Sequence, residues 1–169
     1  MMASNTITVY LLLGTNVGDR LSLLEQAVAY IGKEAGKILN TSAVYETAAW
    51  GNENQPDYLN QVLCVKTSLP PQQLLEKINA IEASLGRQRK TKWEPRPMDI
   101  DILLYGDQVI QTARLQVPHP LLPDRRFALV PLREIAPDLR HPVLHLTITD
   151  LLKNTSDPLT VKLHKTATK

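Results

Sequence analysis

The sequence predicts a single domain of the α+β class, in which helices pack on an antiparallel β-sheet. Its 169 residues suffice for one hydrophobic core. Runs of β-forming residues alternate with segments whose apolar residues recur at helical spacing. Glycine or proline stands at most of the boundaries between these segments. We therefore expect residues 1–169 to form one domain, with tails at 1–6 and 155–169.

The first third of the chain predicts a strand, a helix and a second strand. Residues 7–13 are rich in β-formers and end at Gly14, which is typical of a buried strand. A helix follows and is expected to end near Gly36. Residues 37–50 favour extended backbone and lead into the polar loop 51–57. The apolar face of the helix consists of Leu21, Leu24, Val28 and Ile31.

The middle of the chain predicts a strand followed by a helix. Residues 58–68 form the strand, and Pro70 and Pro71 open the helix, where a missing N–H is tolerated. Gly86 ends the helix, and a heavily charged loop occupies residues 87–98. The apolar stripe of this helix consists of Leu74, Ile78, Ile81 and Leu85.

The last part of the chain completes the pattern. Residues 99–105 predict a strand, and residues 109–110 are expected to pair back on it as a hairpin. A helix over 125–135 is closed by Pro137, and a short helix is expected at 149–153. The strand–helix order β-α-β-β-α-β is the split βαβ pattern of ferredoxin-like folds, with helices on one face of the sheet and long loops that carry the chemistry.

Composition excludes several classes of protein. A net charge of +2 gives no general attraction to nucleic acid or to an anionic membrane. The longest N-terminal apolar run, residues 9–13, is far shorter than the roughly 20 residues that cross a bilayer. Cys64 is the only cysteine, so no internal disulfide can form, and its apolar neighbours favour a buried thiol over a nucleophile. We expect a cytoplasmic protein.

Several common catalytic motifs are missing. The seven glycines form neither a P-loop nor the glycine fingerprint of a dinucleotide-binding fold, and no serine elbow is present. His141 and His145 have the spacing of a metal pair on a helix, but Pro142 between them makes a helix improbable. A zinc site at this position is therefore disfavoured.

Two carboxylates carry the clearest chemical signal. In a strand, alternate residues share a face, so Asp99 and Asp101 project together while Ile100, Ile102 and Leu104 project into the core. The two acids lie about 6.6 Å apart along the strand and repel each other unless a cation lies beside them. Such oxygen ligands suit Mg²⁺, which takes one or two carboxylates together with phosphate oxygens.

Basic residues surround this acidic pair in the sequence. Guanidinium groups bind phosphate oxygens in pairs, so acids that hold Mg²⁺ beside arginines are typical of phosphoryl transfer. Either feature alone is more often a solvated surface, and together they leave both a solvated surface and metal–phosphate chemistry open. The cations are Arg87, Arg89, Lys90, Lys92, Arg96, Arg114, Arg125 and Arg126.

Separate segments of the chain also carry motifs in an order typical of one enzyme family. The motifs lie at residues 13–16, 55–60, 81–87, 95–106 and 117–120. With them, the chain from about Val9 to Leu152 resembles the 6-hydroxymethyl-7,8-dihydropterin pyrophosphokinase family. The resemblance implies a ferredoxin-like fold, in agreement with the element order above. It also implies that ATP and a reduced pterin are the partners of a monomer that binds neither nucleic acid nor membrane.

The resemblance also implies a reaction and its residues. The pterin hydroxymethyl oxygen attacks the β-phosphorus of ATP, and AMP leaves. Asp99 and Asp101 hold two Mg²⁺ ions, and they form the catalytic set with Arg87 and Arg96, which close over the phosphates. The implied ATP contacts are Glu82, Trp93, Arg96, Ile102, Arg114, His119 and Arg125. The implied pterin contacts are Thr47, Ala48, Trp50, Tyr58, Asn60, Trp93 and Phe127, with Tyr58 and Phe127 on the two faces of the ring.

The chain departs from the family pattern at three positions, which bear on affinity and loop motion. Glu94 stands where a small residue is usual, Trp50 replaces an aliphatic residue, and Pro120 replaces an aromatic one. Another Mg²⁺-dependent, ATP-using transferase on the same fold remains the main alternative. An RNA-binding module and a regulatory ligand-binding domain are the others, and the scarcity of aromatic residues disfavours the first of these.

Overall fold

A computed structural model describes residues 5–48, 56–86 and 97–165 of the chain. Its centre is a six-stranded sheet in the order β5-β1-β4-β3-β8, with β2 also paired to β4, and every pairing is antiparallel. The predicted α+β class is confirmed. The strands of the sheet are β1 (Ile7–Thr15), β2 (Lys37–Thr41), β3 (Val44–Thr47), β4 (Tyr58–Thr67), β5 (Asp99–Tyr105) and β8 (Val161–Lys165).

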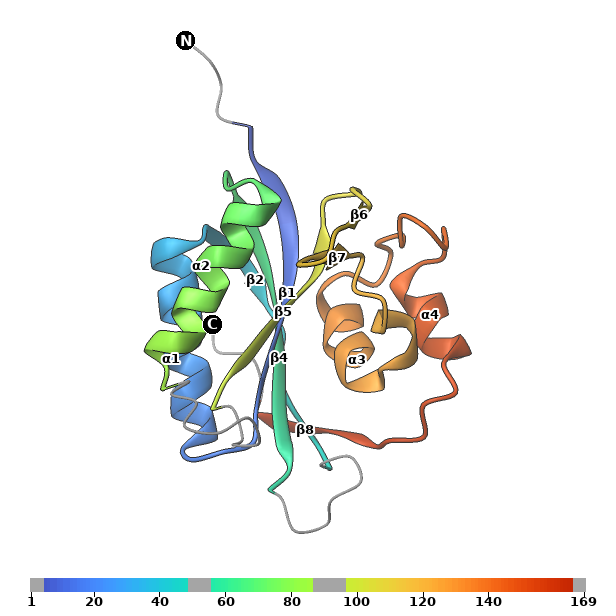
Figure 1. Ribbon diagram of the computed structural model, residues 1–169. Coiled ribbons are helices and arrows are strands. Elements are labelled where there is room, and N and C mark those ends of the chain that lie inside the picture. Colours follow the sequence, from blue (N-terminus) through green and yellow to red (C-terminus); the bar gives the residue numbers. More distant parts are fainter. Residues whose placement is uncertain (1–4, 49–55, 87–96, 166–169) are drawn as a thin grey trace.

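Helices cover both faces of this sheet, not one face as predicted (Figure 1). α1 (Arg20–Glu34) and α2 (Pro71–Ser84) lie on one side, and α3 (Arg126–Ile135) and α4 (Ile148–Asn154) lie on the other. The reason is that the unbroken apolar run of β1 is buried on both faces of the sheet, where it contributes to two hydrophobic cores. Leu11 and Leu13 pack toward α1 and α2, whereas Leu12 packs toward α3 and α4. Unbroken apolar runs, without polar alternation, are typical of strands that are buried on both faces.

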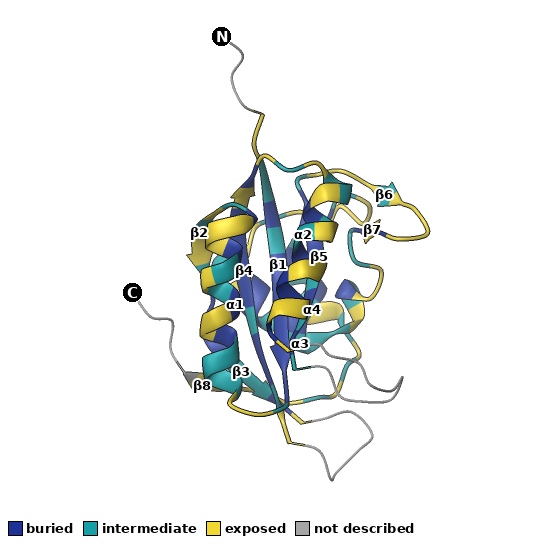
Figure 2. Ribbon diagram, turned by 60° about the vertical axis from the view of Figure 1, so that its left-hand side comes forward, coloured by how far each residue is buried: buried dark blue, intermediate teal, exposed yellow. Residues whose placement is uncertain are grey.

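Burial follows this layered arrangement. Figure 2 shows dark blue, buried residues along the central strands and yellow, exposed residues on the outer surfaces of the helices. The predicted stripes of α1 and α2 face the sheet: Leu24, Ile31, Leu74 and Ile78 are almost fully buried. None of the helices in the described part of the chain has the length and apolar character needed to span a membrane.

Two predictions about the strands are wrong. Within the described part of the predicted strand, residues 37–48, the chain breaks at Ser42 and Ala43 into β2 and β3, which pair with successive parts of β4. The Ser42 hydroxyl stabilises this break, since it donates to Ala43 O and accepts from Val62 N. The hairpin expected at 109–110 pairs elsewhere: β6 (Ile110–Gln111) bonds to β7 (Gln116–Val117) and not to β5.

A β-bulge changes the predicted faces of β5. The pairing with β1 shifts between Tyr10 and Leu11, so that Leu103 is an extra residue between Ile102 and Leu104. Ile102 packs toward α1 and α2 as predicted, but Leu104 joins Leu103 in the core under α3 and α4. The alternation predicted for this strand therefore holds from Asp99 to Ile102 and is wrong for Leu104.

The tail predicted at 155–169 is wrong as far as residue 165. After α4 the chain crosses the end of the sheet and forms β8, which pairs with β3 from Val44 to Thr47 (Figure 1). Asp157 anchors the crossing, because its carboxylate accepts hydrogen bonds from Arg126 N and Leu159 N. The last part of the chain is thus a structural element beside α3 and β3.

His141 predicts how stability depends on pH. It is 5% exposed, and its Nδ1 accepts from Val143 N and Leu144 N at 3.2 and 3.1 Å. Burial lowers its pKa, and nearby His145 lowers it further. The unfolded chain, with a histidine pKa of about 6.5, therefore binds the proton more readily, so the free energy of unfolding is retained above that pH and falls below it.

Urea unfolding at about pH 7.5 and about pH 5.5 tests this prediction. The urea midpoint of the natural chain should be lower at the acidic pH. It should drop less in His141→Asn, because the amide oxygen accepts the same two hydrogen bonds without titrating. Equal drops in the two proteins would contradict the assignment to His141.

Candidate active site

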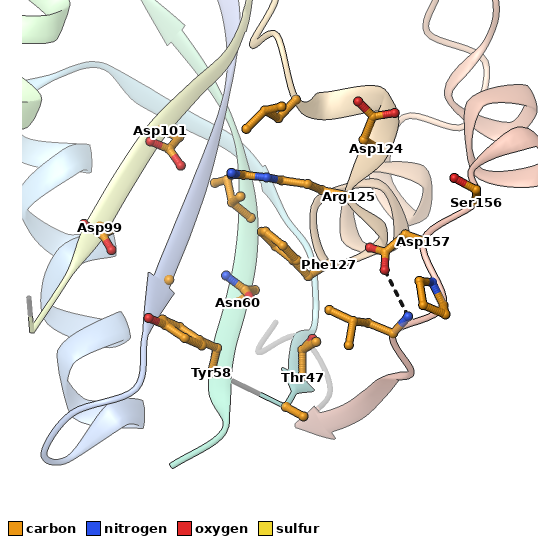
Figure 3. Close-up of a pocket in the computed structure, with 16 residues that line it drawn as sticks. Thr47, Tyr58, Asn60, Asp99, Asp101, Asp124, Arg125, Phe127, Ser156 and Asp157 are labelled. Atoms are coloured by element: carbon orange, nitrogen blue, oxygen red, sulfur yellow. Dashed lines mark hydrogen bonds between the residues drawn. The ribbon is translucent and has the colours of Figure 1, made fainter. Parts of the chain in front are cut away.

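A cavity of about 560 Å³ opens between one end of the sheet and the start of α3 (Figure 3). Strands β1, β3, β4 and β5 contribute to it from the sheet, and residues 121–127 and 156–159 form the opposite wall. The predicted site residues that line it are Thr47, Ala48, Tyr58, Asn60, Asp99, Asp101, Arg125 and Phe127. Residues that are widely separated in the sequence and were predicted to share a site therefore do meet.

Strand register explains why these side chains meet. Asp99 of β5 pairs with Gly14 of β1, and Gly14 pairs in turn with Asn60 of β4. The three residues form one row across the sheet, at about 4.8 Å per strand. Two residues back along β1 from Gly14, Leu12 pairs with Asp101. The acidic pair and the amide therefore lie on adjoining parts of the same cavity floor.

The two carboxylates stand on the face of β5 that turns away from α1 and α2. Asp99 and Asp101 are half-buried and line the cavity, while Ile100 between them is in the core. The buried Glu82 side chain of α2 accepts a hydrogen bond from Ile100 N at 2.9 Å. This bond ties the acidic segment of β5 to α2 and fixes the direction in which both aspartates point.

The donor set fits Mg²⁺ better than a metal held by protein alone. No group of three or more histidine, cysteine or acidic residues that could hold a metal occurs among the described residues. Asp99 and Asp101 can supply oxygen ligands, and the cavity beside them leaves room for phosphate oxygens and water. Mg²⁺ typically binds in this way, through one or two carboxylates and the phosphates of a substrate.

Gly14 provides the space that Asn60 occupies. A Cβ atom at Gly14 would lie 2.7 Å from Nδ2 of Asn60, which is closer than real Cβ contacts allow. That amide is 4% exposed and donates to Leu13 O at 3.2 Å. An alanine at position 14 must therefore push the Asn60 side chain out of its place on the cavity floor.

We accordingly expect Gly14→Ala to weaken binding of a ligand that hydrogen-bonds to Asn60 by roughly tenfold, the effect of one displaced hydrogen bond. Calorimetric titration measures the change. Gly32→Ala in α1 is the matched control: its Cβ would meet Ile38 Cδ1 at 3.4 Å, and alanine favours a helix, so binding should not change. Unchanged binding in Gly14→Ala would show that Asn60 does not contact the ligand.

Tyr58 and Phe127 lie on opposite sides of the cavity, one on β4 and the other on α3 (Figure 3). Burial raises the pKa of Tyr58, and the charge of Asp99 raises it further, so its hydroxyl stays protonated. The guanidinium of Arg125 lies 5.4 Å from the centre of the Phe127 ring, within the range of a cation–π contact. A flat aromatic ligand can fit between these two side chains.

Thr47 and Ala48 close the cavity at the end of β3. Thr47 is 3% exposed, and its Oγ1 has no hydrogen-bond partner in the described part of the chain. A buried hydroxyl beside a cavity is available to a polar edge of a bound molecule. Together with Asn60, Thr47 makes this corner suited to a ring that both donates and accepts hydrogen bonds.

His119 does not line this cavity, but it lies close enough to Asp101 and Arg125 for their charges to act on it. Burial lowers its pKa, the charge of Asp101 acts in the opposite direction, and that of Arg125 lowers it further. Its Nδ1 accepts from Leu121 N at 3.1 Å, so the neutral ring carries its proton on Nε2 and can donate there. Arg125 reaches across the cavity toward the side of the aspartates (Figure 3).

The other predicted residues lie outside the cavity lining or outside the described ranges. Glu82 is buried on α2, Ile102 is buried within β5, and Arg114 is exposed in the turn between β6 and β7, so their contacts with ATP stay predictions. Trp50, Arg87, Trp93, Glu94 and Arg96 belong to residues 49–55 and 87–96, which lie outside the described residues.

Part of the cavity wall consists of residues that the sequence did not predict as site residues. Leu12, Gly14, Leu121 and Asp124 line it, as do residues 156–159. Gly14 belongs to a motif noted above, but no role followed from the motif. Residues 156–159 were placed in a tail because they are polar and contain Pro158, although Leu159, Val161 and Leu163 alternate as they do in a strand.

Comparisons with known proteins agree with this geometry. Residues 10–137 match the family described as 7,8-dihydro-6-hydroxymethylpterin-pyrophosphokinase (HPPK). The chain is 53% identical over 136 residues to the 2-amino-4-hydroxy-6-hydroxymethyldihydropteridine pyrophosphokinase of Aquifex aeolicus. This alignment covers 80% of the present chain and 84% of the relative. It is 39% identical over 159 residues to the protein of the same name from Haemophilus influenzae, over 94% and 99% of the two chains.

A solved structure shows the same fold. Crystalline HPPK-DHPS of Plasmodium falciparum, a triple mutant with SDX-DHP, matches with a TM-score of 0.71 at 21% identity. The match covers 89% of this chain but 44% of the Plasmodium chain, so the present chain spans less than half of that protein. At this level of identity the likeness concerns the fold alone.

Proposed function

We propose that the cavity described above binds both substrates of a pyrophosphate transfer. The chain belongs to the 7,8-dihydro-6-hydroxymethylpterin-pyrophosphokinase family. It therefore transfers pyrophosphate from ATP to 6-hydroxymethyl-7,8-dihydropterin in folate synthesis. The single observation that carries this proposal is the meeting of a paired carboxylate, an arginine and two aromatic rings around one cavity of about 560 Å³. That volume lies in the range of small-molecule sites.

In this proposal, the pterin binds at the end near β3 and β4. Its ring lies between Tyr58 and Phe127, and its polar edge bonds to Asn60 and the end of β3 at Thr47 and Ala48. Aromatic rings stack best in offset arrangements, which two side chains on opposite walls allow. Trp50 and Trp93 are proposed to complete this side.

ATP is proposed to bind along the other side, with its phosphates between the aspartates and α3. Arg125 provides a guanidinium for phosphate oxygens, and neutral His119 provides one N–H donor. Arg87 and Arg96 are proposed to cover the phosphates from the charged segment. Glu82, Ile102 and Arg114 remain proposed ATP contacts, with Glu82 also holding β5 in place.

The reaction moves one group and one proton. The hydroxymethyl oxygen forms a bond to the β-phosphorus of ATP, the bond from the β-phosphorus to the bridging oxygen of the α-phosphate breaks, and AMP leaves with that oxygen. Asp99 lies at the end of the acidic pair nearest Asn60 and Tyr58, so it is proposed to take up the hydroxyl proton. The side chains here mainly position the substrates and balance charge.

Mg²⁺ fits the two carboxylates, and two ions are proposed to bind at Asp99 and Asp101. The chemistry that the ions supply is neutralisation of charge on the triphosphate as the phosphorus–oxygen bond breaks. The protein's own contribution is to hold both acids on one face of β5, through the register with β1 and the bond from Ile100 N to Glu82.

One assay tests the proposal and separates it from another Mg²⁺-dependent transferase. Protein, Mg²⁺, ATP and 6-hydroxymethyl-7,8-dihydropterin are mixed, and the nucleotide product is identified by chromatography. AMP together with the pterin pyrophosphate is expected. ADP would indicate a simple kinase and free pyrophosphate a nucleotidyltransferase, and either product would overturn the proposal.

We propose that a monomer suffices, because the described residues around the cavity already include two carboxylates, a guanidinium and two aromatic rings. Cys64 is a free, buried cysteine, and we propose no nucleophilic role for it. We propose that the enzyme works in the cytoplasm, where a reducing environment keeps such thiols free. No nucleic acid or membrane is proposed as a partner.

A further inference from the structure

The wall of the cavity opposite the sheet depends on a segment of the chain beyond the residues that the family model matches. The match ends at residue 137, whereas residues 156–159 line the cavity. These residues join α4 to β8, and β8 pairs with β3 so that Val161 lies opposite Thr47. The segment therefore connects the start of α3 to the end of β3, which are the two parts of the proposed pterin site.

Asp157 makes the connection to α3. Its Oδ2 accepts from Arg126 N at 2.9 Å, and its Oδ1 accepts from Leu159 N at 3.0 Å (Figure 3 shows the second bond). Arg126 is the first residue of α3, and its Nε donates to Leu159 O at 3.1 Å. Two hydrogen bonds thus join residues 157 and 159 to Arg126 at the start of the helix, and a third joins residues 157 and 159 to each other.

This connection replaces a missing helix cap. The N-cap residue of α3 is Arg125, and it makes no capping hydrogen bond with its side chain. The first backbone N–H groups of a helix have no partner within the helix, and a carboxylate there also interacts favourably with the helix dipole. Asp157 supplies this carboxylate from a position 31 residues farther along the chain.

The residues on either side of Arg126 are the ones proposed to bind substrate. Arg125 and Phe127 both line the cavity, and they contact each other. The directions of their side chains are set by the first turn of α3, which Asp157 holds. Both carboxylate oxygens already accept backbone hydrogen bonds, so Asp157 acts through α3 and is not itself catalytic.

We propose that Asp157 is a positioning residue that sets pterin affinity by fixing the first turn of α3, an inference that rests on the proposed function of the cavity. Without the cap, the fraction of molecules with Phe127 in place falls, and the apparent Kd rises by the inverse of that fraction. At saturating substrate the bound arrangement is restored, so kcat is retained.

The test compares Asp157→Ala, Asp157→Asn and Thr147→Val with the natural chain. Thr147 is the matched control: its Oγ1 accepts from Asp150 N at 3.1 Å and caps α4 on the same side of the sheet, so its loss removes a cap that does not touch the cavity. Titration with 6-hydroxymethyl-7,8-dihydropterin, in the presence of Mg²⁺ and α,β-methylene-ATP, gives Kd. Steady-state kinetics give KM and kcat, and urea unfolding gives stability.

Asp157→Ala should raise the Kd and KM for the pterin about five- to tenfold and leave kcat within roughly twofold. Asp157→Asn keeps an acceptor oxygen and should recover most of the affinity. Thr147→Val should lower stability to a similar degree without changing Kd. An unchanged Kd in Asp157→Ala, no recovery in Asp157→Asn, or an equal rise in Thr147→Val would each overturn the inference. Failure of the proposed function is a separate result, since the natural chain would then form no AMP.

Discussion

Asp101→Asn should lower kcat by roughly a thousandfold, which corresponds to about 4 kcal/mol of lost transition-state stabilisation. The substitution keeps the size of the side chain but removes the charge that is proposed to hold Mg²⁺ beside the triphosphate. Asp101 is half-buried at the cavity, and its neighbours Ile100 and Ile102 carry the packing of β5, so the fold should be retained. Steady-state formation of AMP measures the loss.

The matched control is Asp107→Asn, which removes one negative charge from an exposed turn just after β5. It should turn over at the natural rate, because Asp107 does not line the cavity. Circular dichroism and the urea midpoint should agree among all three proteins. Normal turnover by Asp101→Asn would mean that the metal is bound elsewhere.

Phe127→Ala should raise the Kd for the pterin roughly thirtyfold, or about 2 kcal/mol, which is the order of one aromatic stacking contact with a heterocyclic base. The ring is the aromatic surface that α3 presents to the cavity, and Arg125 lies against it. Titration with 6-hydroxymethyl-7,8-dihydropterin in the presence of Mg²⁺ and α,β-methylene-ATP measures the change.

Two further variants separate stacking from bulk. Phe127→Tyr keeps the ring and should bind nearly as well as the natural chain, whereas Phe127→Leu keeps an apolar side chain without a ring and should fall between tyrosine and alanine. If leucine bound as well as phenylalanine, packing of α3 would account for the effect and the proposed ring sandwich would be wrong.

The helices and central strands could be predicted because their patterns depend on local rules. The stripe of Leu74, Ile78 and Ile81 defines α2, and Pro71 and Gly86 mark its ends. The second layer of helices could not be predicted, because the unbroken apolar run of β1 indicates burial without showing which elements cover each face. The bulge at Leu103 depends on pairing with β1, which local residue patterns do not encode. The residues of β8 alternate as in a strand, but only the pairing with β3 shows that they extend the sheet.

The same division holds for the site. Asp99 and Asp101 could be predicted as a pair, since two residues of one strand share a face by geometry alone. Asp157 could not be predicted as a site residue. Its role depends on the hydrogen bond from Arg126 N, which forms only when α3 and the segment between α4 and β8 have folded together. Gly14 is an intermediate case: the sequence shows a glycine, but only the register with Asn60 shows what a larger residue would displace.

The extra residue in β5 divides the strand into a part that tolerates a change of length and a part that does not. Deleting Leu103 would remove the bulge, and Leu104 would still follow Ile102 onto the opposite face, into the core that it already occupies. Deleting Ile100 would make Asp99 and Asp101 neighbours on opposite faces, with one acid driven into the apolar layer beneath α1 and α2. Related chains should therefore vary in length at the bulge and keep a constant one-residue interval between the two acids.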